Sequence, residues 1–464
     1  MNQAAQTTSS ASRSRTWLAY VLMLALAALV FAWIQSRGSA LVAPAPLAPE
    51  AAGAHSNAAA SGTLLHVLLA LAVILVLARG AGWLFRKLRQ PPVIGEVLIG
   101  IALGPSLLGA LAPAAQSYLL PPAVQPYLGV IAQIGVILFM FSVGLELDPR
   151  MLKSRAHVTV VIAHASIVVP FLLGSALALW LYPRLSSSDV PFNAFTLFLG
   201  VSMAVTAFPV LARILTDRGM QRSRLGVLAL TCAAVGDVSA WCLLAFVVSV
   251  VRSRVGDAFW TFGLVALYVA AMLLFVRPLI ARLVARYDEQ GLTQNALSLI
   301  TVGLLLSALA TEWIGVHALF GAFLFGSLIP HDSKIAQELI KHVESLVLTL
   351  FLPAFFAFTG LHTQIGLLSG IEGWMWCGVI VAVASLGKFG GCYVAARATG
   401  FGGKDAAALG VLMNTRGLME LIVLNVGLEL GVVTPTLFAM LVIMAIVTTL
   451  ATAPLLEWLR VRPD

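Results

Sequence analysis

Long apolar blocks recur along the whole chain, and they constrain its fold more than any other feature. Leu225–Val251 is one of them: it contains 27 residues, and Asp237, close to its centre, is the only charged one. At about 1.5 Å of rise per residue, a helix of this length crosses a bilayer. We count thirteen such blocks. They cover residues 63–84, 92–109, 125–146, 157–182, 193–215, 225–251, 258–284, 294–312, 316–330, 339–361, 373–397, 405–429 and 434–458.

The composition supports a membrane protein. The 464 residues are 60% hydrophobic and only 10% charged, whereas soluble domains have about 25% charged residues. The net charge of +8 could indicate a nucleic-acid partner, but the basic residues lie in short loops between apolar blocks. We therefore predict an all-α, multi-pass membrane protein of about 13 transmembrane helices, embedded in the lipid bilayer, with no nucleic-acid partner.

The basic residues also predict an orientation. On one side of the expected spans, the loops and the span ends next to them carry 20 of the 28 Lys and Arg residues, and the opposite loops carry 3. Cytoplasmic loops carry the excess of positive charge. This places the C-terminus, with its short tail 459–464, in the cytoplasm, and a bacterial inner (plasma) membrane is the expected location.

A signal-like segment precedes the thirteen blocks. Trp17–Gln35 is apolar and follows Arg13 and Arg15, and an Ala- and Pro-rich stretch follows it. Residues 1–62 are therefore a signal peptide or a signal anchor with a linker, and the sequence leaves both alternatives open. The transmembrane domain then covers residues 63–458.

Polar residues interrupt a few of the apolar blocks. Charged residues inside a membrane are expensive and mark functional sites. The candidates are Asp237, Lys388, Thr206, Asn414, Thr415, Arg416 and Glu420, with Pro209, Gly236 and Gly417 as helix-break residues.

Two interruptions occupy corresponding halves of the chain. Thr206–Pro209 lies in the block before Asp237, and Asn414–Glu420 lies in the block after Lys388. Such a pair of broken helices is typical of transporters built from inverted repeats, in which the breaks meet near the membrane midplane. Structural alternatives are an Asp237–Lys388 ion pair, a simple proline kink, and a self-neutralising helical pair of Arg416 and Glu420.

Several longer motifs carry a family resemblance. They are PPVIGEVLIGIALGPSLLG (91–109), LFMFSVGLELDPRML (138–152), AVTAFPVLARIL (204–215), AAVGDVSAWCLLA (233–245), GKFGG (387–391) and MNTRGLMELIVLNVGLELGV (413–432). Over residues 63–458 the chain resembles the second branch of the monovalent cation:proton antiporter family. That branch includes glutathione-gated potassium efflux systems and plant cation/proton exchangers.

The resemblance implies a homodimer of thirteen-helix subunits, each with a dimerisation part and a mobile core. Residues 204–215 and 413–424 would be two crossed, partly unwound helices. Asp237 would bind the transported monovalent cation, Lys388 would be the basic residue of the core, and Glu420 would match the acidic position after the second crossing.

One residue departs from the family pattern. Members usually carry Asp, Asn or Gln before the aspartate, and this chain has Gly236. Two adjacent carboxylates accompany net charge movement, and an amide accompanies electroneutral exchange. Glycine supplies neither, so we expect electroneutral exchange or Glu420 as the partner of Lys388.

The expected function is exchange of Na⁺ or K⁺ for protons by an elevator-type, alternating-access mechanism. A proton and a cation would compete for the Asp237 oxygens, and each would neutralise the buried charge before the site crosses the low-dielectric barrier. The alternatives are a gated potassium efflux system, with a separate cytoplasmic regulatory subunit, and a non-transporting sensor. Motifs such as HExxH or GxSxG are absent from the sequence, so we expect neither an enzyme nor a cofactor.

Overall fold

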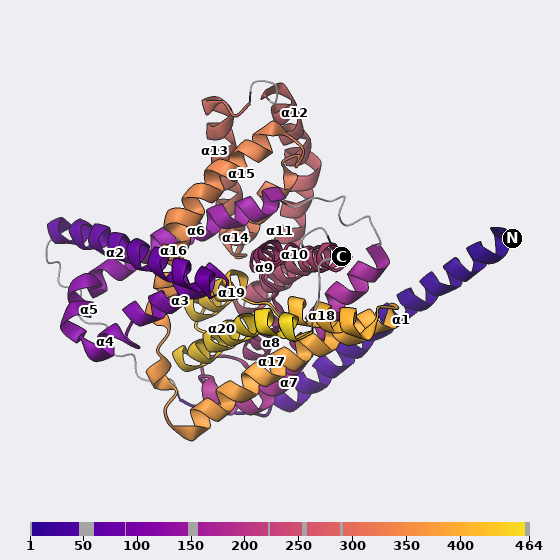
Figure 1. The fold of residues 1–464 in the computed structure, drawn as a ribbon, viewed down its shortest axis with the longest axis horizontal. Coiled ribbons are helices and arrows are strands. Elements are labelled where there is room, and N and C mark those ends of the chain that lie inside the picture. Colours follow the sequence, from indigo (N-terminus) through magenta and orange to yellow (C-terminus); the bar gives the residue numbers. More distant parts are fainter. Residues whose placement is uncertain are drawn as a thin grey trace. The chain divides into compact units, whose positions relative to one another are not determined.

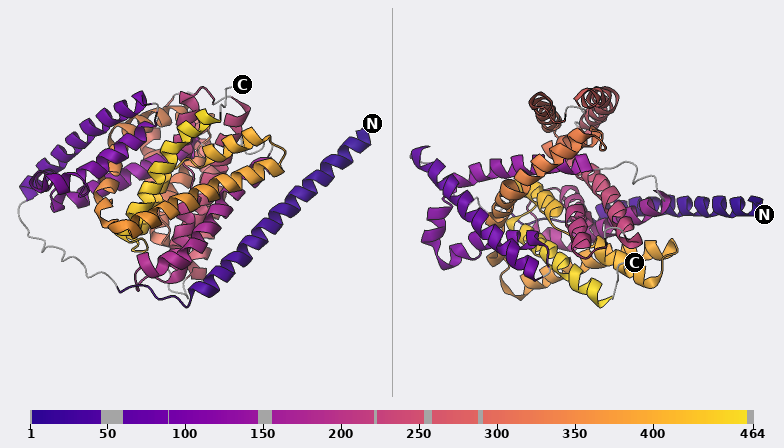
Figure 2. Two further views of the ribbon diagram at one scale, coloured as in Figure 1. Left: turned by 60° about the horizontal axis from the view of Figure 1, so that its bottom comes forward. Right: turned by 45° about the horizontal axis from the view of Figure 1, so that its top comes forward.

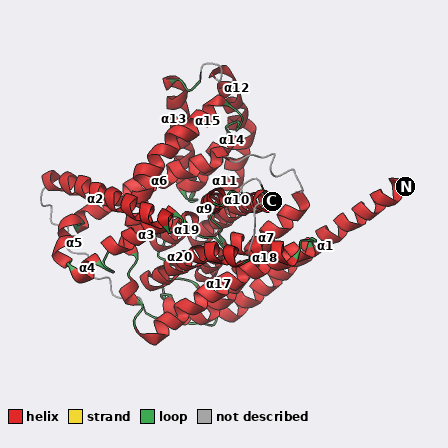
Figure 3. Ribbon diagram, viewed as in Figure 1, coloured by secondary structure: helices red, strands yellow, loops and turns green. Residues whose placement is uncertain are grey.

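The computed structural model describes residues 2–45, 60–88, 90–146, 156–220, 223–252, 258–287 and 291–459. Helices dominate these ranges, and none of their residues forms a strand (Figure 3). The predicted all-α class is therefore confirmed. Residues 46–59 of the predicted linker and 460–464 of the predicted tail lie outside the described part of the chain.

The predicted number of spans agrees with the helices. Eleven described helices are long and apolar enough to cross a membrane, and α18 (Gly403–Met413) and α19 (Leu418–Glu429) form a further span bent by 43°. Two shorter apolar helices are α8 (Phe192–Ala204) and α14 (Ala318–Leu328). Apart from the helix at the N-terminus, these elements correspond one by one to the thirteen predicted blocks.

The chain forms two compact units, and each draws on separate stretches of the sequence. Unit 1 contains Met1–Leu47, Pro149–Ala240 and Leu368–Asp464, and unit 2 contains Ala48–Asp148 and Trp241–Leu367. Besides α8, α18 and α19, unit 1 contains α1 (Asn2–Gly38), α7 (Ala156–Leu185), α9 (Phe208–Asp217), most of α10 (Arg224–Arg252), α17 (Gly370–Ala398) and α20 (Pro435–Trp458).

Unit 1 contains the same helix pattern twice. A continuous helix, a broken pair and a second continuous helix occur in the order α7, α8/α9, α10, and again in the order α17, α18/α19, α20. The second set begins seven spans after the first, so the two sets cross the membrane in opposite directions. This arrangement agrees with the predicted inverted repeats. Helix α7 packs along α17 and α8 (Figures 1 and 2).

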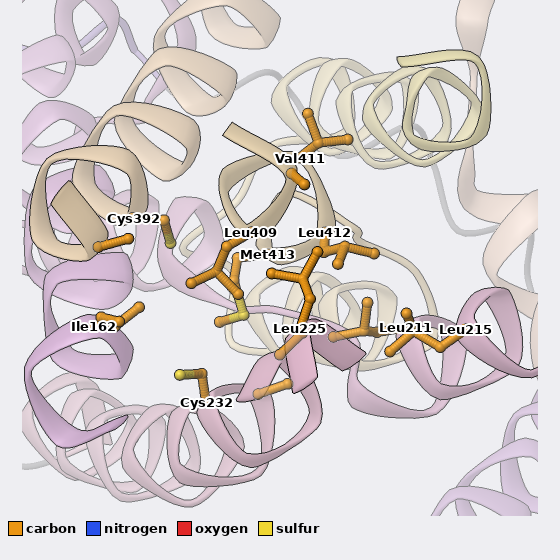
Figure 4. Close-up of a cluster of buried hydrophobic side chains, with 14 of the residues drawn as sticks. Ile162, Leu211, Leu215, Leu225, Cys232, Cys392, Leu409, Val411, Leu412 and Met413 are labelled. Atoms are coloured by element: carbon orange, nitrogen blue, oxygen red, sulfur yellow. The ribbon is translucent and has the colours of Figure 1, made fainter. Parts of the chain in front are cut away.

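A buried apolar cluster packs against the broken helices in unit 1. It combines side chains of both repeats, as Figure 4 shows for Leu211 and Leu215 of α9, Leu412 and Met413 of α18, and Cys392 of α17. Helices in lipid are held together by close packing, because lipid tails are as apolar as the side chains themselves. This cluster therefore fixes the two repeats against each other and holds both helix breaks in place.

The helices of unit 2 make close contacts through small residues. Besides α14 and the end of α10, they are α2 (Ala60–Lys87), α3 (Pro92–Leu103), α4 (Leu108–Leu111), α5 (Pro113–Leu119), α6 (Gln125–Glu146), α11 (Ala258–Ala271), α12 (Arg277–Tyr287), α13 (Gln294–Ile314), α15 (Lys334–Leu346) and α16 (Leu352–His362). Gly326 of α14 approaches Gly144 of α6 so closely that an added methyl group would lie 3.2 Å from the Gly144 Cα atom. Glycines thus permit the close helix contacts that stabilise membrane bundles.

Helix α1 contains the predicted signal-like segment Trp17–Gln35 and packs against α7. Tyr20 stacks edge-on against His164 at 5.5 Å, Phe31 lies 5.6 Å from Phe171, and Ile34 is completely buried. An anchor helix makes contacts of this kind. A cleaved signal peptide and a signal anchor stay the two predicted alternatives for this segment.

Candidate ion-binding site

The two helix breaks of unit 1 lie against each other. Residues 205–207 separate α8 from α9, and residues 414–417 separate α18 from α19. The backbone N–H of Ala207 donates to the Thr415 carbonyl at 3.1 Å, and the Thr206 hydroxyl donates to the Met413 carbonyl at 3.4 Å. The predicted pair of interrupted helices therefore meets at one place in the fold.

Local sequence explains where each break ends. Pro209 occupies the first turn of α9, where a missing N–H costs no helical hydrogen bond. Gly417 precedes α19 with φ at 155° and ψ at −131°, a conformation that is almost confined to glycine. Pro209 and Gly417, two of the three predicted helix-break residues, therefore lie where a new half-helix begins.

Gly236 does not break its helix, so the prediction for this residue is wrong. Helix α10 continues without interruption from Arg224 to Arg252 and passes through Gly236. A glycine costs a helix only about 1 kcal/mol relative to alanine and leaves the hydrogen bonds intact, unlike a proline. A methyl group built on Gly236 would meet no atom within 4 Å.

Two cationic side chains cover the C-terminal end of α8. Arg416 donates from Nη1 to the Ser202 carbonyl at 3.0 Å and from Nη2 to the Met203 carbonyl at 2.7 Å. The Lys388 ammonium donates to the next carbonyl, that of Ala204. The last carbonyls of a helix lack partners within the helix and carry its negative dipole end. The Arg416 and Lys388 side chains supply both the hydrogen-bond donors and the positive charge that this helix end lacks.

Arg416 also forms a buried ion pair. Its Nη1 atom lies 3.1 Å from Oε2 of Glu420, and both side chains are fully buried. Arg416 belongs to the break, whereas Glu420 lies in the first turn of α19, so the pair connects the unwound stretch to the half-helix. The predicted contact between these residues is confirmed. A helical pair on one continuous helix, however, is the wrong description.

Threonines of α20 hold the second break, and sequence analysis missed them. The Thr449 hydroxyl lies 3.0 Å from the Arg416 backbone nitrogen and 2.6 Å from the Arg416 carbonyl oxygen. The Thr452 hydroxyl lies 3.4 Å from that of Thr415. The sequence TTLAT within an apolar block was the available signal, because hydroxyls inside a membrane seek backbone partners.

Asp237 is the acidic group that these contacts leave uncommitted. It is 4% exposed, and none of the described side chains donates a hydrogen bond to its oxygens; the Phe208 backbone N–H approaches the carboxylate but falls short of standard hydrogen-bond geometry. Its charge interacts with the backbone N–H of Phe208, the first residue of α9, and with the Lys388 ammonium. A helix N-terminus carries the positive end of the helix dipole, so the start of α9 faces the Asp237 side chain with its unpaired N–H groups.

Lys388 is not the ion-pair partner of Asp237 that one structural alternative predicted. Its ammonium binds the carbonyls of Ser166, at 3.0 Å, and of Ala204. No ion pair joins Lys388 to Asp237 among the residues that the structure describes. Asp237 therefore keeps its oxygens available for another cation.

The remaining candidates lie at the same breaks. Asn414 and Thr415 belong to the second break and are buried, and the Asn414 side-chain oxygen accepts no hydrogen bond from a described group. Within the described ranges, His, Cys, Asp and Glu residues form no group of three or more that could hold a metal ion. The site thus offers one carboxylate, hydroxyls, an amide and backbone carbonyls, which are ligands suited to hard monovalent cations.

Comparisons with known proteins agree with this architecture. Residues 72–458 match the family model described as sodium/hydrogen exchanger, transmembrane. The chain is 46% identical over 398 residues to the Na⁺/H⁺ antiporter NhaS4 of Synechocystis, which covers 85% of this chain and 97% of that protein. These findings confirm the antiporter resemblance.

Two further relatives and one solved structure extend the comparison. Cation/H⁺ antiporter 17 of Arabidopsis thaliana is 40% identical, and K⁺/H⁺ antiporter 1 of Saccharomyces cerevisiae is 33% identical. The matches cover 84% and 80% of this chain but only 48% and 44% of those longer proteins. The structure of the sodium proton antiporter MjNhaP1 from Methanocaldococcus jannaschii has the same fold, with a TM-score of 0.56 at 16% identity over 85% of this chain and 97% of the other.

Proposed function

Because this chain belongs to the sodium/hydrogen exchanger family, we propose that it exchanges a monovalent cation for protons at the Asp237 carboxylate. One observation carries the assignment of the site. Asp237 is buried beside the start of a half-helix, and its oxygens are free of hydrogen bonds to described groups while the neighbouring charges are all engaged.

Competition for Asp237 explains how the two fluxes are coupled. A buried carboxylate is costly when charged and alone. A bound proton or a bound cation removes that cost, and the site then crosses the membrane in a neutral form. An empty, charged site does not cross, so each cation that moves one way is exchanged for a proton that moves the other way.

Alternating exposure requires that the site move as one body. Asp237, Lys388, Arg416, Glu420 and Thr206 all belong to unit 1, and buried contacts between its two repeats hold the breaks together. A rigid-body displacement of this unit, as in an elevator, would carry the site without breaking those contacts. The homodimer, the separate regulatory subunit, the bacterial inner membrane and the cytoplasmic C-terminus remain predictions.

We expect electroneutral exchange. Arg416 and Glu420 neutralise each other at 3.1 Å, Lys388 is engaged by carbonyls, and Gly236 supplies no second carboxylate. One titrating charge therefore binds one proton or one monovalent cation. In proteoliposomes with a lumenal pH dye, Na⁺ or K⁺ should move protons at the same rate with and without a clamped membrane potential, and choline should move none. A rate that follows the clamp would exclude one-for-one exchange.

Gly236→Asp tests the same argument from the opposite direction. The position has room for a Cβ atom, so we expect the variant to fold. A second carboxylate beside Asp237 adds a titrating group to the mobile site, and exchange should then respond to the membrane potential. Gly236→Ala is the matched control and should stay electroneutral. Potential-independent exchange in Gly236→Asp would show that stoichiometry is set elsewhere.

A further inference from the structure

Helix α7 contains a proline, Pro170, in the buried part of its interior. In an α-helix each N–H donates to the carbonyl four residues earlier, and proline has no N–H to donate. The carbonyl of Ser166 therefore has no partner from its own helix at position 170. Buried carbonyls are almost always paired, so another donor must reach it.

Lys388 of α17 is that donor. Its Nζ atom lies 3.0 Å from the Ser166 carbonyl oxygen, and it also donates to the Ala204 carbonyl. The Ser166 hydroxyl is engaged elsewhere, because it donates to Ala163 at 2.7 Å within α7. The lysine is thus held by the backbone that the proline exposes and not by the serine side chain.

Two glycines bring α17 close enough for this contact. A methyl group on Gly387 would lie 2.9 Å from the Pro170 Cα atom, and one on Gly391 would lie 2.7 Å from the Ala165 carbonyl oxygen. Neither position tolerates a side chain without displacement of α7. The proline, the two glycines and the lysine therefore form one packed arrangement around the exposed carbonyl.

The charges around Lys388 show why its position matters. The titratable and charged groups that act on it are Arg416 and Glu420 of the second break, Asp237 of α10 and Cys392 of its own helix. Arg416 and Glu420 are paired with each other. An ammonium released from its carbonyls would therefore find Asp237 as the carboxylate without a partner.

We propose that Pro170 is a positioning residue for cation exchange: the N–H that it lacks frees the Ser166 carbonyl to hold the Lys388 ammonium away from Asp237. The cation and the lysine would otherwise compete for the same carboxylate. This inference rests on the proposed role of Asp237 and assigns to α7 a part in setting the affinity for the cation.

Pro170→Ala is the test, and Pro183→Ala in the same helix is its control. The alanine N–H would bind the Ser166 carbonyl, so Lys388 would retain Ala204 alone and compete at Asp237. Since a charge-assisted hydrogen bond is lost, the apparent KM for Na⁺ or K⁺ should rise about ten- to a hundredfold, with the maximal exchange rate within about twofold. Pro183→Ala should keep the wild-type KM, because none of the described side chains donates a hydrogen bond to the carbonyl four residues before Pro183.

A double variant separates positioning from a general effect on α7. Pro170→Ala should have no further effect on cation affinity in a Lys388→Gln background. Stabilisation of the detergent-solubilised protein by NaCl or KCl against heat, relative to choline chloride, measures affinity even in variants that do not transport. A wild-type KM in Pro170→Ala, or an effect that persists without Lys388, would overturn the inference. Absence of a cation response in the wild type would instead refute the proposed function, and the inference with it.

Discussion

Replacement of Asp237 with asparagine should abolish cation-driven proton movement completely, so that proteoliposomes containing the variant respond no more than empty liposomes. Asparagine keeps the shape of the side chain but neither binds a proton nor compensates a cation. The stability should be retained or increased, because the variant removes a buried carboxylate whose oxygens form no hydrogen bonds with described groups. Proton flux and thermal midpoint, measured on the same preparation, test both statements.

The control for this experiment is a carboxylate of the same unit outside the site. Glu372 lies 3.8 Å from Arg184, and its side chain is 73% exposed. Glu372→Gln should therefore exchange at the wild-type rate. If Asp237→Asn still drives protons against a cation gradient, the ion-binding carboxylate must be another residue. Glu420 would then be the next candidate, although its pairing with Arg416 counts against it.

Most of the architecture could be predicted from the sequence because a bilayer imposes a length on each helix. All thirteen predicted apolar blocks correspond to helices or to pairs of helices. The two breaks were also predictable, since Pro209 and the run Asn414–Glu420 interrupt otherwise apolar blocks. Polar groups inside lipid have few structural explanations besides pairing and function.

The partners of the buried charges could not be predicted. Sequence separation hides them, because Lys388 binds a carbonyl 222 residues away and Arg416 binds carbonyls 213 and 214 residues away. The residue type alone favoured an opposite charge for Lys388, whereas the fold provides backbone oxygens. The helix break predicted at Gly236 is absent as well. A glycine permits a break but does not impose one, and α10 continues through it.

Arg416 should be the residue whose loss damages the protein most. Its guanidinium binds Oε2 of Glu420 and two carbonyls of α8 at once, and it is completely buried. Arg416→Met removes the charge and leaves Glu420 and those carbonyls without a partner. Removal of one member of a buried ion pair costs about 3–5 kcal/mol, so we expect a large loss of folded protein by size-exclusion chromatography and a strongly reduced thermal midpoint.

The second substitution Glu420→Gln should recover part of this loss, because an amide tolerates burial better than an unpaired carboxylate does. Lysine in place of Arg416 should restore less of the lost stability than Glu420→Gln does in the double variant. An ammonium cannot reproduce the planar fork that contacts the Ser202 and Met203 carbonyls together. The control is Arg218→Met. Arg218 pairs with Glu457 at 2.9 Å, and the two side chains are 21% and 59% exposed, so solvent screens this pair far more than the fully buried one. Equal losses in Arg416→Met and Arg218→Met would mean that the buried network contributes no more to stability than a surface contact. The breaks would then be held by the Thr449 and Thr452 hydroxyls and by the packing of the two repeats.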